Sequence, residues 1–435
     1  MLIKLINGYT IVFITPKKNK TAYVSSIIAN GFCNETPDDV GINHVLEHVL
    51  FDSWKKCKPH ACSQFWVKKP VFINGFTTMT QIKYFADGLS DELPAMLDYI
   101  IDITTQPIFL QTHLTAAKKI VVNELNTRIN SVDYELNKTL SNELYSIPGF
   151  QQATNDLLQK KNVENISLRD LVDYHAKYYT PSNTYFFVSG DYAVSRVLQT
   201  FKDRLPAQKM LALPTSAVLK NPFSYASSKL LFVKNRAITG GAVHFSIMCP
   251  IDIHINNERI MHLQLTCSII NTDLTTILRV EHKLIYSISV LCDTYYYGTV
   301  IEIKGTCSES NLVSILEYIT AYLREKKTKY IDNDILENTK KLLLLFRYNH
   351  IKNPMEIAEF YESQYMLNYM QKPYFLHNHH HDHIYSETEY DDNVKSVRAA
   401  HIRAIIKMIH FNHIIIGYMG KKNLNLTVLG YFNRT

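Results

Sequence analysis

Residues 43–51 read NHVLEHVLF and place two histidines and one glutamate within a short apolar run. His44, Glu47 and His48 have the spacing H-x-x-E-H, and a helix projects three such side chains within an arc of about 100°. Burying two imidazoles and a carboxylate without partners costs roughly a few kcal/mol each. A divalent cation removes this cost, because imidazoles are metal ligands and the carboxylate can polarise a nearby water. The segment therefore predicts a helix with two metal ligands and a general base.

The two-histidine site requires a third ligand, because catalytic zinc normally takes three protein ligands and keeps one position open. Glu124 is the best candidate, since helical spacing places it on an apolar stripe of the surrounding segment. The other members of this stripe are Ala117, Ile120, Val121 and Leu125. We therefore expect a buried carboxylate at Glu124 that meets His44 and His48 at one cation.

These residues resemble the family of pitrilysin, insulinase and the mitochondrial processing peptidase. Residues 31–51 contain the histidine motif, and Glu124 follows His48 by 76 positions (124 − 48). Residues 73–78 (INGFTT) are similar to the family's substrate-binding edge strand, and residues 167–191 to the helix, turn and strand that close its first domain. The resemblance implies an α+β fold of two homologous domains that form half of a clamshell. Each domain would be a mainly antiparallel sheet with helices packed on one face.

The resemblance also implies a zinc-dependent endopeptidase with one zinc ion per chain, held by His44, His48 and Glu124. Zinc would lower the pKa of its water, and Glu47 would accept the proton and pass it to the leaving amine. The substrate would be an unfolded or short peptide that adds a strand to the exposed sheet edge. The residues expected to contact it are Asn74, Gly75 and Phe76. A hairpin turn or bulge at Asn74 and Gly75 is the structural alternative.

A second stretch, residues 278–286 (LRVEHKLIY), resembles an Arg and Tyr pair of the family seven positions apart (286 − 279). By this resemblance Tyr286 would donate a hydrogen bond to the developing oxyanion, and Arg279 would hold the substrate or Tyr286 in place. An ordinary amphipathic junction in a sheet is the alternative. In the family this pair acts on the zinc of the opposite unit of a chamber. We therefore expect a homodimer, or a heterodimer with a related chain.

One position departs from the family pattern. Active relatives usually carry a second glutamate seven residues before the metal-binding one, where this chain has Ala117. That carboxylate would orient a histidine or the metal-bound water, and such partners matter about 10- to 100-fold. The alternative function is therefore a catalytically weak or inactive processing or scaffold subunit of the same fold.

The chain also shows signs of an internal duplication. Residues 10–15 and 22–28 are expected to form neighbouring strands, and residues 229–234 with 241–248 repeat the pair about 220 positions later. Each half ends with a helical stretch that runs into an apolar strand led by asparagine. These strands are Asn183 to Val188 and Asn412 to Ile416.

The predicted domains follow this repeat. Residues 1–205 would form the zinc-binding catalytic domain, and residues 223–435 a duplicated domain without the metal motif. Residues 206–222 contain three prolines without sustained periodicity and are interpreted as the linker. In the second half, residues 254–262 lack the H-x-x-E-H spacing, which leaves one metal per chain.

Composition excludes several other classes. A formal charge of +6 on 435 residues, with scattered lysines, favours a solvated surface over nucleic-acid binding. Seven cysteines are an odd number and are expected to be reduced thiols. No signal-peptide pattern and no apolar run of about 18 residues is present, so we expect a soluble intracellular protein without a membrane partner. The tract at residues 377–383 (HNHHHDH) is interpreted as a surface loop with adventitious metal affinity.

Overall fold

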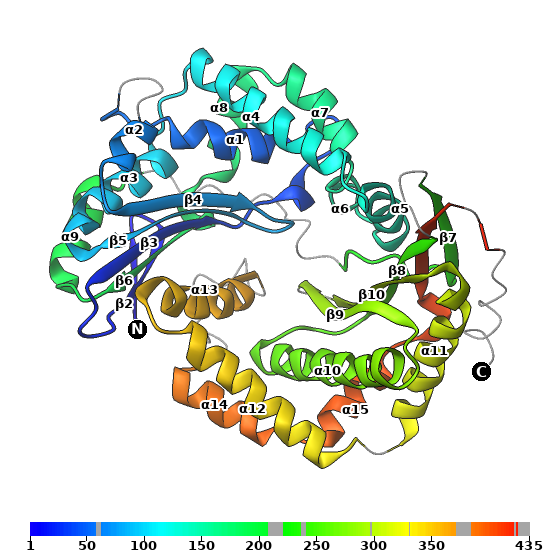
Figure 1. The fold of residues 1–435 in the computed structure, drawn as a ribbon. Coiled ribbons are helices and arrows are strands. Elements are labelled where there is room, and N and C mark those ends of the chain that lie inside the picture. Colours follow the sequence, from blue (N-terminus) through cyan, green and yellow to red (C-terminus); the bar gives the residue numbers. More distant parts are fainter. Residues whose placement is uncertain are drawn as a thin grey trace. The chain divides into compact units, whose positions relative to one another are not determined.

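The computed structural model describes the chain except for residues 58–61, 208–220, 236–240, 296–297, 330, 371–383, 422 and 425–435. The described residues form two compact units, each built on one sheet, as Figure 1 shows. The architecture confirms the expected α+β class with two sheet-containing domains. Most of the predicted linker and the whole histidine tract at 377–383 lie outside the described residues.

The sheet of unit 1 has six strands in the order β1-β2-β6-β3-β5-β4. Their bounds are β1 Leu2–Ile6, β2 Tyr9–Ile14, β3 Thr21–Ile28, β4 Val71–Thr77, β5 Ile82–Leu89 and β6 Thr184–Gly190. The prediction that the strands β2 and β3 are neighbours is wrong, because β6 lies between them, parallel to β2 and antiparallel to β3. Every residue of β6 is buried. A strand that is buried on both faces belongs in the middle of a sheet, which accounts for its place.

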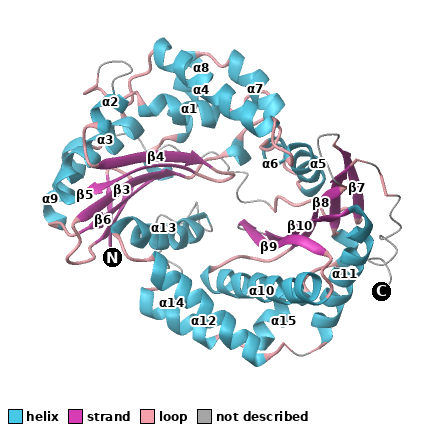
Figure 2. Ribbon diagram, in the orientation of Figure 1, coloured by secondary structure: helices cyan, strands magenta, loops and turns pink. Residues whose placement is uncertain are grey.

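A layer of helices covers one face of this sheet (Figure 2). The helices of unit 1 are α1 Ile42–Phe51, α2 Cys62–Val67, α3 Leu93–Thr105, α4 Gln111–Ile129, α6 Pro148–Gln152, α7 Asp156–Asn165, α8 Leu168–Tyr178, α9 Val194–Arg204 and α13 Pro354–Met370. α3 packs on β3 and β5, and α1 packs on β4 and against α4. The main hydrophobic core lies between this layer and the sheet. The predicted layer of helices on one face is therefore confirmed, and α13 is an additional helix outside that layer.

One helix, α13, covers the opposite face of the same sheet. It packs on β3 and β6, and its Glu362 Oε2 lies 2.6 Å from Lys83 Nζ on β5, with both side chains buried. The hydroxyls of Tyr23 and Ser25 donate to Oε1 of the same carboxylate, at 3.1 and 2.5 Å. The neighbouring residue Tyr84 points to the helical layer, where it contacts Phe51 of α1. Because successive strand residues face opposite ways, Lys83 and α13 lie on the other face.

The sheet of unit 2 has five strands in the order β7-β11-β8-β10-β9. Their bounds are β7 Lys229–Lys234, β8 Ala242–Ile251, β9 Ile285–Tyr295, β10 Gly298–Ser308 and β11 Ile415–Gly420. β11 is parallel to β7 and antiparallel to β8, the same insertion that β6 makes in unit 1. The predicted neighbours β7 and β8 are thus also separated by a third strand. The shared pattern agrees with a duplicated unit.

The helices of unit 2 are α5 Tyr134–Leu144, α10 Asn257–Thr275, the π-helix η5 Thr276–Glu281, α11 Leu312–Thr328, α12 Asn333–His350, α14 Glu387–Ser396 and α15 Ala399–Lys407. α5 packs on β11 and β7 so closely that a Cβ at Gly417 would lie 2.8 Å from Leu136 and from Leu140. Each unit therefore includes one helix from the part of the chain that builds most of the other, α13 in unit 1 and α5 in unit 2.

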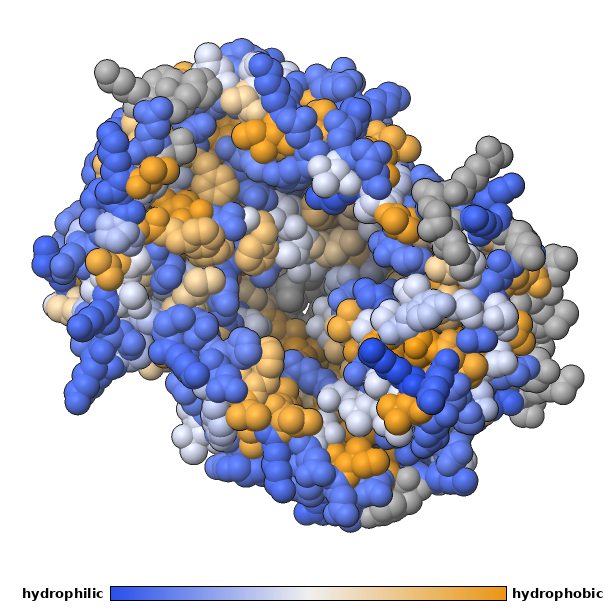
Figure 3. Space-filling model, in the orientation of Figure 1, coloured by the Kyte–Doolittle hydropathy of each residue, from blue (hydrophilic) through white to orange (hydrophobic). Residues whose placement is uncertain are grey.

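Two further findings concern the expected environment. Within the described ranges, no helix combines the length and the apolar character that crossing a membrane requires. All seven cysteines are described, and all are free. Figure 3 shows hydrophilic side chains over much of the visible face, with hydrophobic groups interspersed.

Candidate metal centre

The helix α1 is fixed at its first turn by the carboxylate of Glu35. The backbone N–H groups of Gly41 and Asn43 donate to the two oxygens of Glu35, both at 2.9 Å. A helix start leaves such N–H groups without intrahelical partners. Burial raises the pKa of Glu35 to about 8, and these two hydrogen bonds act in the opposite direction. The Asn43 amide also donates to the Tyr174 hydroxyl (3.0 Å), so that the rotation of α1 about its axis is set.

The structure brings His44, His48 and Glu124 together. Glu124 Oε2 lies 3.0 Å from His44 Nε2 and 3.6 Å from His48 Nε2. Zinc with bonds of about 2.1 Å in tetrahedral geometry holds its ligand atoms roughly 3.4 Å apart. Two imidazoles and one carboxylate at these separations fit a zinc ion. Among the described residues this is the one group of three such side chains close enough to share a cation.

The surroundings favour the protonation states that bind a metal. A hydrogen bond with His44 lowers the pKa of Glu124, which keeps this carboxylate ionised. Burial lowers the pKa of His48, and the neighbouring His44 lowers it further. A metal binds the neutral imidazole and the ionised carboxylate. Nδ1 of His44 is buried and has no hydrogen-bond partner within the described part of the chain.

The prediction that Glu124 is buried is wrong. Its side chain is 46% exposed, and Ile120, expected on the same stripe, is also exposed. The buried residues of α4 are His113, Leu114, Ala117, Val121 and Leu125. Glu124 is the neighbour of Leu125 and lies at the margin of this buried stripe. An exposed carboxylate beside two mostly buried imidazoles leaves one side of the site open. A catalytic metal needs such an open position for water or substrate.

Glu47 is buried next to these ligands and is connected to the sheet. Thr77 Oγ1, on the last residue of β4, donates to Glu47 Oε2 at 2.7 Å. Burial raises the pKa of Glu47, while the Thr77 hydrogen bond and His44 lower it. The sequence placed Thr77 in the candidate edge strand but gave it no role at Glu47. Thr77 is two residues after Gly75 and therefore lies on the same face of the strand. This spacing could have placed Thr77 next to α1.

The candidate substrate-binding residues lie on β4, the last strand of the sheet of unit 1. β4 pairs with β5 in unbroken register from Val71 to Thr77, so the alternative of a hairpin turn or bulge is wrong. Asn74 and Phe76 are exposed. A Cβ at Gly75 would lie 2.7 Å from the Lys83 carbonyl oxygen and 2.9 Å from the Phe51 ring. Glycine thus allows the close packing of β4 against β5 and α1.

The other two candidate catalytic residues lie in unit 2. Arg279 is an exposed residue of the π-helix η5, and Tyr286 is the second residue of β9. The side chain of Tyr286 is 62% exposed. Both groups are therefore accessible to a molecule that approaches this surface, and neither belongs to the unit that carries the metal centre.

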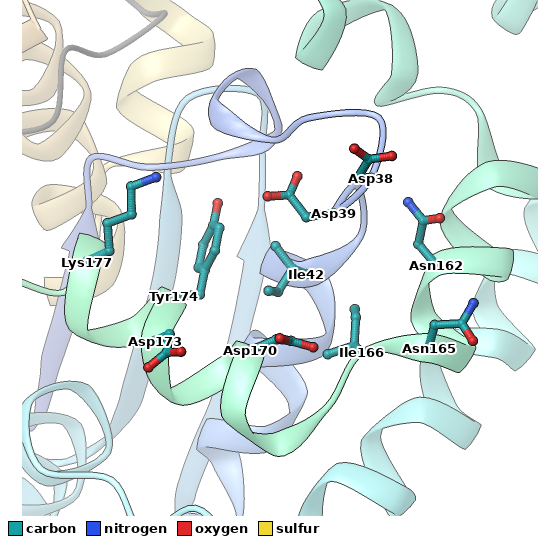
Figure 4. Close-up of a pocket in the computed structure, with 10 residues that line it drawn as sticks. All are labelled: Asp38, Asp39, Ile42, Asn162, Asn165, Ile166, Asp170, Asp173, Tyr174 and Lys177. Atoms are coloured by element: carbon teal, nitrogen blue, oxygen red, sulfur yellow. The ribbon is translucent and has the colours of Figure 1, made fainter.

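A separate pocket of about 420 Å³ opens at the start of α1 (Figure 4). Four aspartates line it, and two of them accept hydrogen bonds from residues close to them in the sequence. Asp39 accepts a hydrogen bond from the Thr36 hydroxyl (2.8 Å), and Asp170 accepts one from the backbone N–H of Ser167 (2.8 Å). None of the metal-centre residues lines this pocket.

Comparisons with known proteins identify the family of this chain. A profile described as Insulinase (Peptidase family M16) matches residues 10–158, and one described as Peptidase M16 inactive domain matches residues 165–343. The chain is 23% identical over 339 residues to the uncharacterized zinc protease YmxG of Bacillus subtilis, covering 77% of this chain and 80% of that protein. It is 25% identical over 219 residues to the zinc protease PqqE of Helicobacter pylori, covering 49% of each. Human insulin-degrading enzyme is 23% identical over 195 residues, which cover 41% of this chain and 18% of that enzyme.

Solved structures match over nearly the whole chain. A protease from Helicobacter pylori has a TM-score of 0.82 at 16% identity and covers 96% of this chain and 98% of its own. A peptidase M16 inactive domain from Pseudomonas fluorescens has a TM-score of 0.78 at 13% identity, covering 97% and 98%. At these identities the matches establish the fold.

Proposed function

The chain belongs to the pitrilysin and insulinase family of peptidases, and on that premise we propose that it is a zinc-dependent endopeptidase. The observation that carries this proposal is the approach of Glu124 to both His44 and His48, with Glu47 beside them. Zinc, when bound, supplies a Lewis acid that activates water near neutral pH. Two neutral imidazoles and one carboxylate would hold it, and the exposed side of Glu124 leaves the fourth position open.

Glu47 is the proposed general base. It lies one helical turn from His44 and directly before His48, so its carboxylate shares the metal side of α1. The hydrogen bond from Thr77 occupies Oε2, which leaves Oε1 to accept a proton from water and return it to the leaving amine. Because Thr77 ends the edge strand β4, the same contact fixes the base relative to a peptide that pairs with β4.

The proposed substrate is an unfolded or short peptide that adds a strand to β4. The outer edge of β4 pairs with no other strand that the structure describes, so its backbone N–H and C=O groups are available to an incoming chain. The proposed contacts come from Asn74, Gly75 and Phe76. Pairing through backbone groups implies weak dependence on the peptide sequence.

Metal content tests the proposal directly. Purified protein is expected to contain one zinc ion per chain, to cleave unfolded peptides, and to lose this activity when a chelator removes the zinc. Re-addition of zinc, and not of magnesium, should restore it, because imidazole ligands favour zinc. The measurements are elemental analysis and cleavage of a quenched fluorescent peptide. Zinc binding without any cleavage would support the inactive or scaffold subunit instead, an alternative that Ala117 favours.

We further propose that Arg279 and Tyr286 act on the metal centre of a second chain, so that the active species is a dimer. Mixing Glu47→Gln chains with Tyr286→Phe chains is expected to give more activity than either sample alone. The reason is that a mixed dimer has one site with both an intact Glu47 and an intact Tyr286. A mixture of Glu47→Gln with the double variant serves as the control and should gain nothing. A fully active monomer in analytical ultracentrifugation would rule the dimer out.

A further inference from the structure

The helix α7 connects the two helices that carry the candidate zinc ligands. Asn162 Nδ2 donates to the carbonyl oxygen of Pro37, in the segment that leads into α1 (2.9 Å). Val163 packs beneath Gly41, where a Cβ would lie 3.2 Å from its Cγ2. On the other side, Lys118 of α4 donates to the carbonyl oxygen of Glu164 (2.9 Å). α7 therefore contacts both ligand-bearing elements.

The strongest of these connections is an ion pair at the first residue of α7. Asp156 Oδ1 lies 3.0 Å from Arg128 Nη2 and accepts a hydrogen bond from Arg128 Nε at 3.1 Å. The side chain of Asp156 is 7% exposed, whereas that of Arg128 is 46% exposed. A buried carboxylate with two contacts to one guanidinium holds that group in a defined place.

Arg128 has a second carboxylate within reach. It follows Glu124 by four positions on α4, the spacing at which a glutamate and a later basic residue attract each other across one helical turn. An arginine that paired with Glu124 would compete with a metal for this carboxylate. In the structure the guanidinium is paired with Asp156 instead, and Glu124 faces the two imidazoles.

The same region lacks the supporting carboxylate of the family pattern, since position 117 is alanine. Nδ1 of His44 has no partner among the described residues. Asp156 is the buried acidic group at the start of α7 that pairs with Arg128 of α4, the helix that carries Glu124.

We propose that Asp156 is a positioning residue of the metal centre, which holds Arg128 away from Glu124 and so keeps that carboxylate available to zinc. This inference rests on the proposed zinc site. Ala117 of α4 has no carboxylate that could support the metal ligands. The proposal assigns a supporting carboxylate to a different helix, α7.

Zinc affinity, measured by competition with a chromogenic chelator, tests the role of Asp156 without reference to activity. Asp156→Asn is expected to weaken zinc binding by about 10- to 100-fold, the range for loss of an outer partner of a ligand. The double variant Asp156→Asn with Arg128→Gln should return to within about threefold of wild type, because the competing cation is gone. Asp173→Asn removes an aspartate whose side chain is 70% exposed and is the matched control, with unchanged affinity.

The outcomes separate this inference from the proposed function. If wild-type protein does not bind zinc, both are overturned. If it binds zinc and Asp156→Asn binds equally well, or if the double variant is as weak as the single one, the positioning role alone is overturned. Should Asp156→Asn fail to fold, Arg128→Gln alone decides. For Arg128→Gln, the positioning role predicts a zinc affinity within about threefold of wild type. A tenfold loss of zinc affinity in this variant contradicts the positioning role.

Discussion

Glu47→Gln is expected to lower kcat for peptide cleavage by about 10²- to 10⁴-fold, the usual contribution of a general base. Glutamine has nearly the same size, and its amide oxygen can still accept the hydrogen bond that Thr77 donates at 2.7 Å. α1 should therefore keep its position on β4, and His44 and His48 should still bind zinc. What is lost is the group that accepts a proton from water. Single-turnover cleavage and zinc content, measured on the same sample, check both halves of this expectation.

Glu164→Gln provides the matched control for this experiment, because Glu164 is an exposed residue of α7. It makes the same chemical change at the surface of the same unit, and full activity is expected. Cleavage by Glu47→Gln at the wild-type rate, still sensitive to a chelator, would show that another group is the base. Loss of zinc together with activity would assign Glu47 to metal retention instead.

Lys83→Met is expected to destabilise unit 1 by about 3–5 kcal/mol, the range observed when one partner of a buried ion pair is removed. Lys83 and Glu362 are both almost fully buried, with 2.6 Å between Nζ and Oε2. Without the lysine, the Glu362 carboxylate would remain in the interior with hydroxyl donors alone on Oε1. Both tryptophans of the chain, Trp54 and Trp66, lie in unit 1. Tryptophan fluorescence during urea unfolding therefore reports on the unfolding of unit 1.

Two further variants define the origin of this loss. The double variant Lys83→Met with Glu362→Met should recover most of the stability, because replacing a whole buried pair with apolar groups is often close to neutral. Lys69→Met breaks a more exposed ion pair, in which the side chain of Lys69 is 29% exposed and that of Glu92 is 21% exposed. This change should lower the stability of unit 1 by at most about 1 kcal/mol. An equal loss in Lys83→Met and Lys69→Met would contradict the importance of the buried pair.

The parts of this molecule that the sequence predicted well depend on short distances along the chain. His44, Glu47 and His48 share one face because helix geometry alone fixes it, and the structure has them on α1. Glu124 was identified from its helical spacing and agreed with the resemblance, and the structure places it beside both imidazoles. The edge position of β4 also followed from resemblance. The family and the α+β fold were therefore predicted correctly, because the motifs that identify them are local.

The parts that could not be predicted depend on which surfaces meet. Lys83 alternates with apolar residues on β5 as a solvated lysine would, and its partner Glu362 is 279 positions later (362 − 83). The insertion of β6 between β2 and β3 is likewise set by pairing with two distant strands. The exposure of Glu124 depends on how α4 packs against the neighbouring helices. Helical periodicity alone does not define this packing. Asp156 has no sequence signal, since its role depends on the packing of α7.

The exchange of α5 and α13 between the two units has a consequence for biosynthesis. Residue 190 ends the last strand of the first sheet, but the helix that covers Lys83 is complete only when the ribosome has added residue 370. During that interval all strands of the first sheet have been synthesised, but the face of the sheet that α13 covers is still exposed. Exposed apolar surface of this kind is a binding site for chaperones. For the same reason, cutting the gene between codons 205 and 223 would deprive each product of a helix encoded on the other side of the cut.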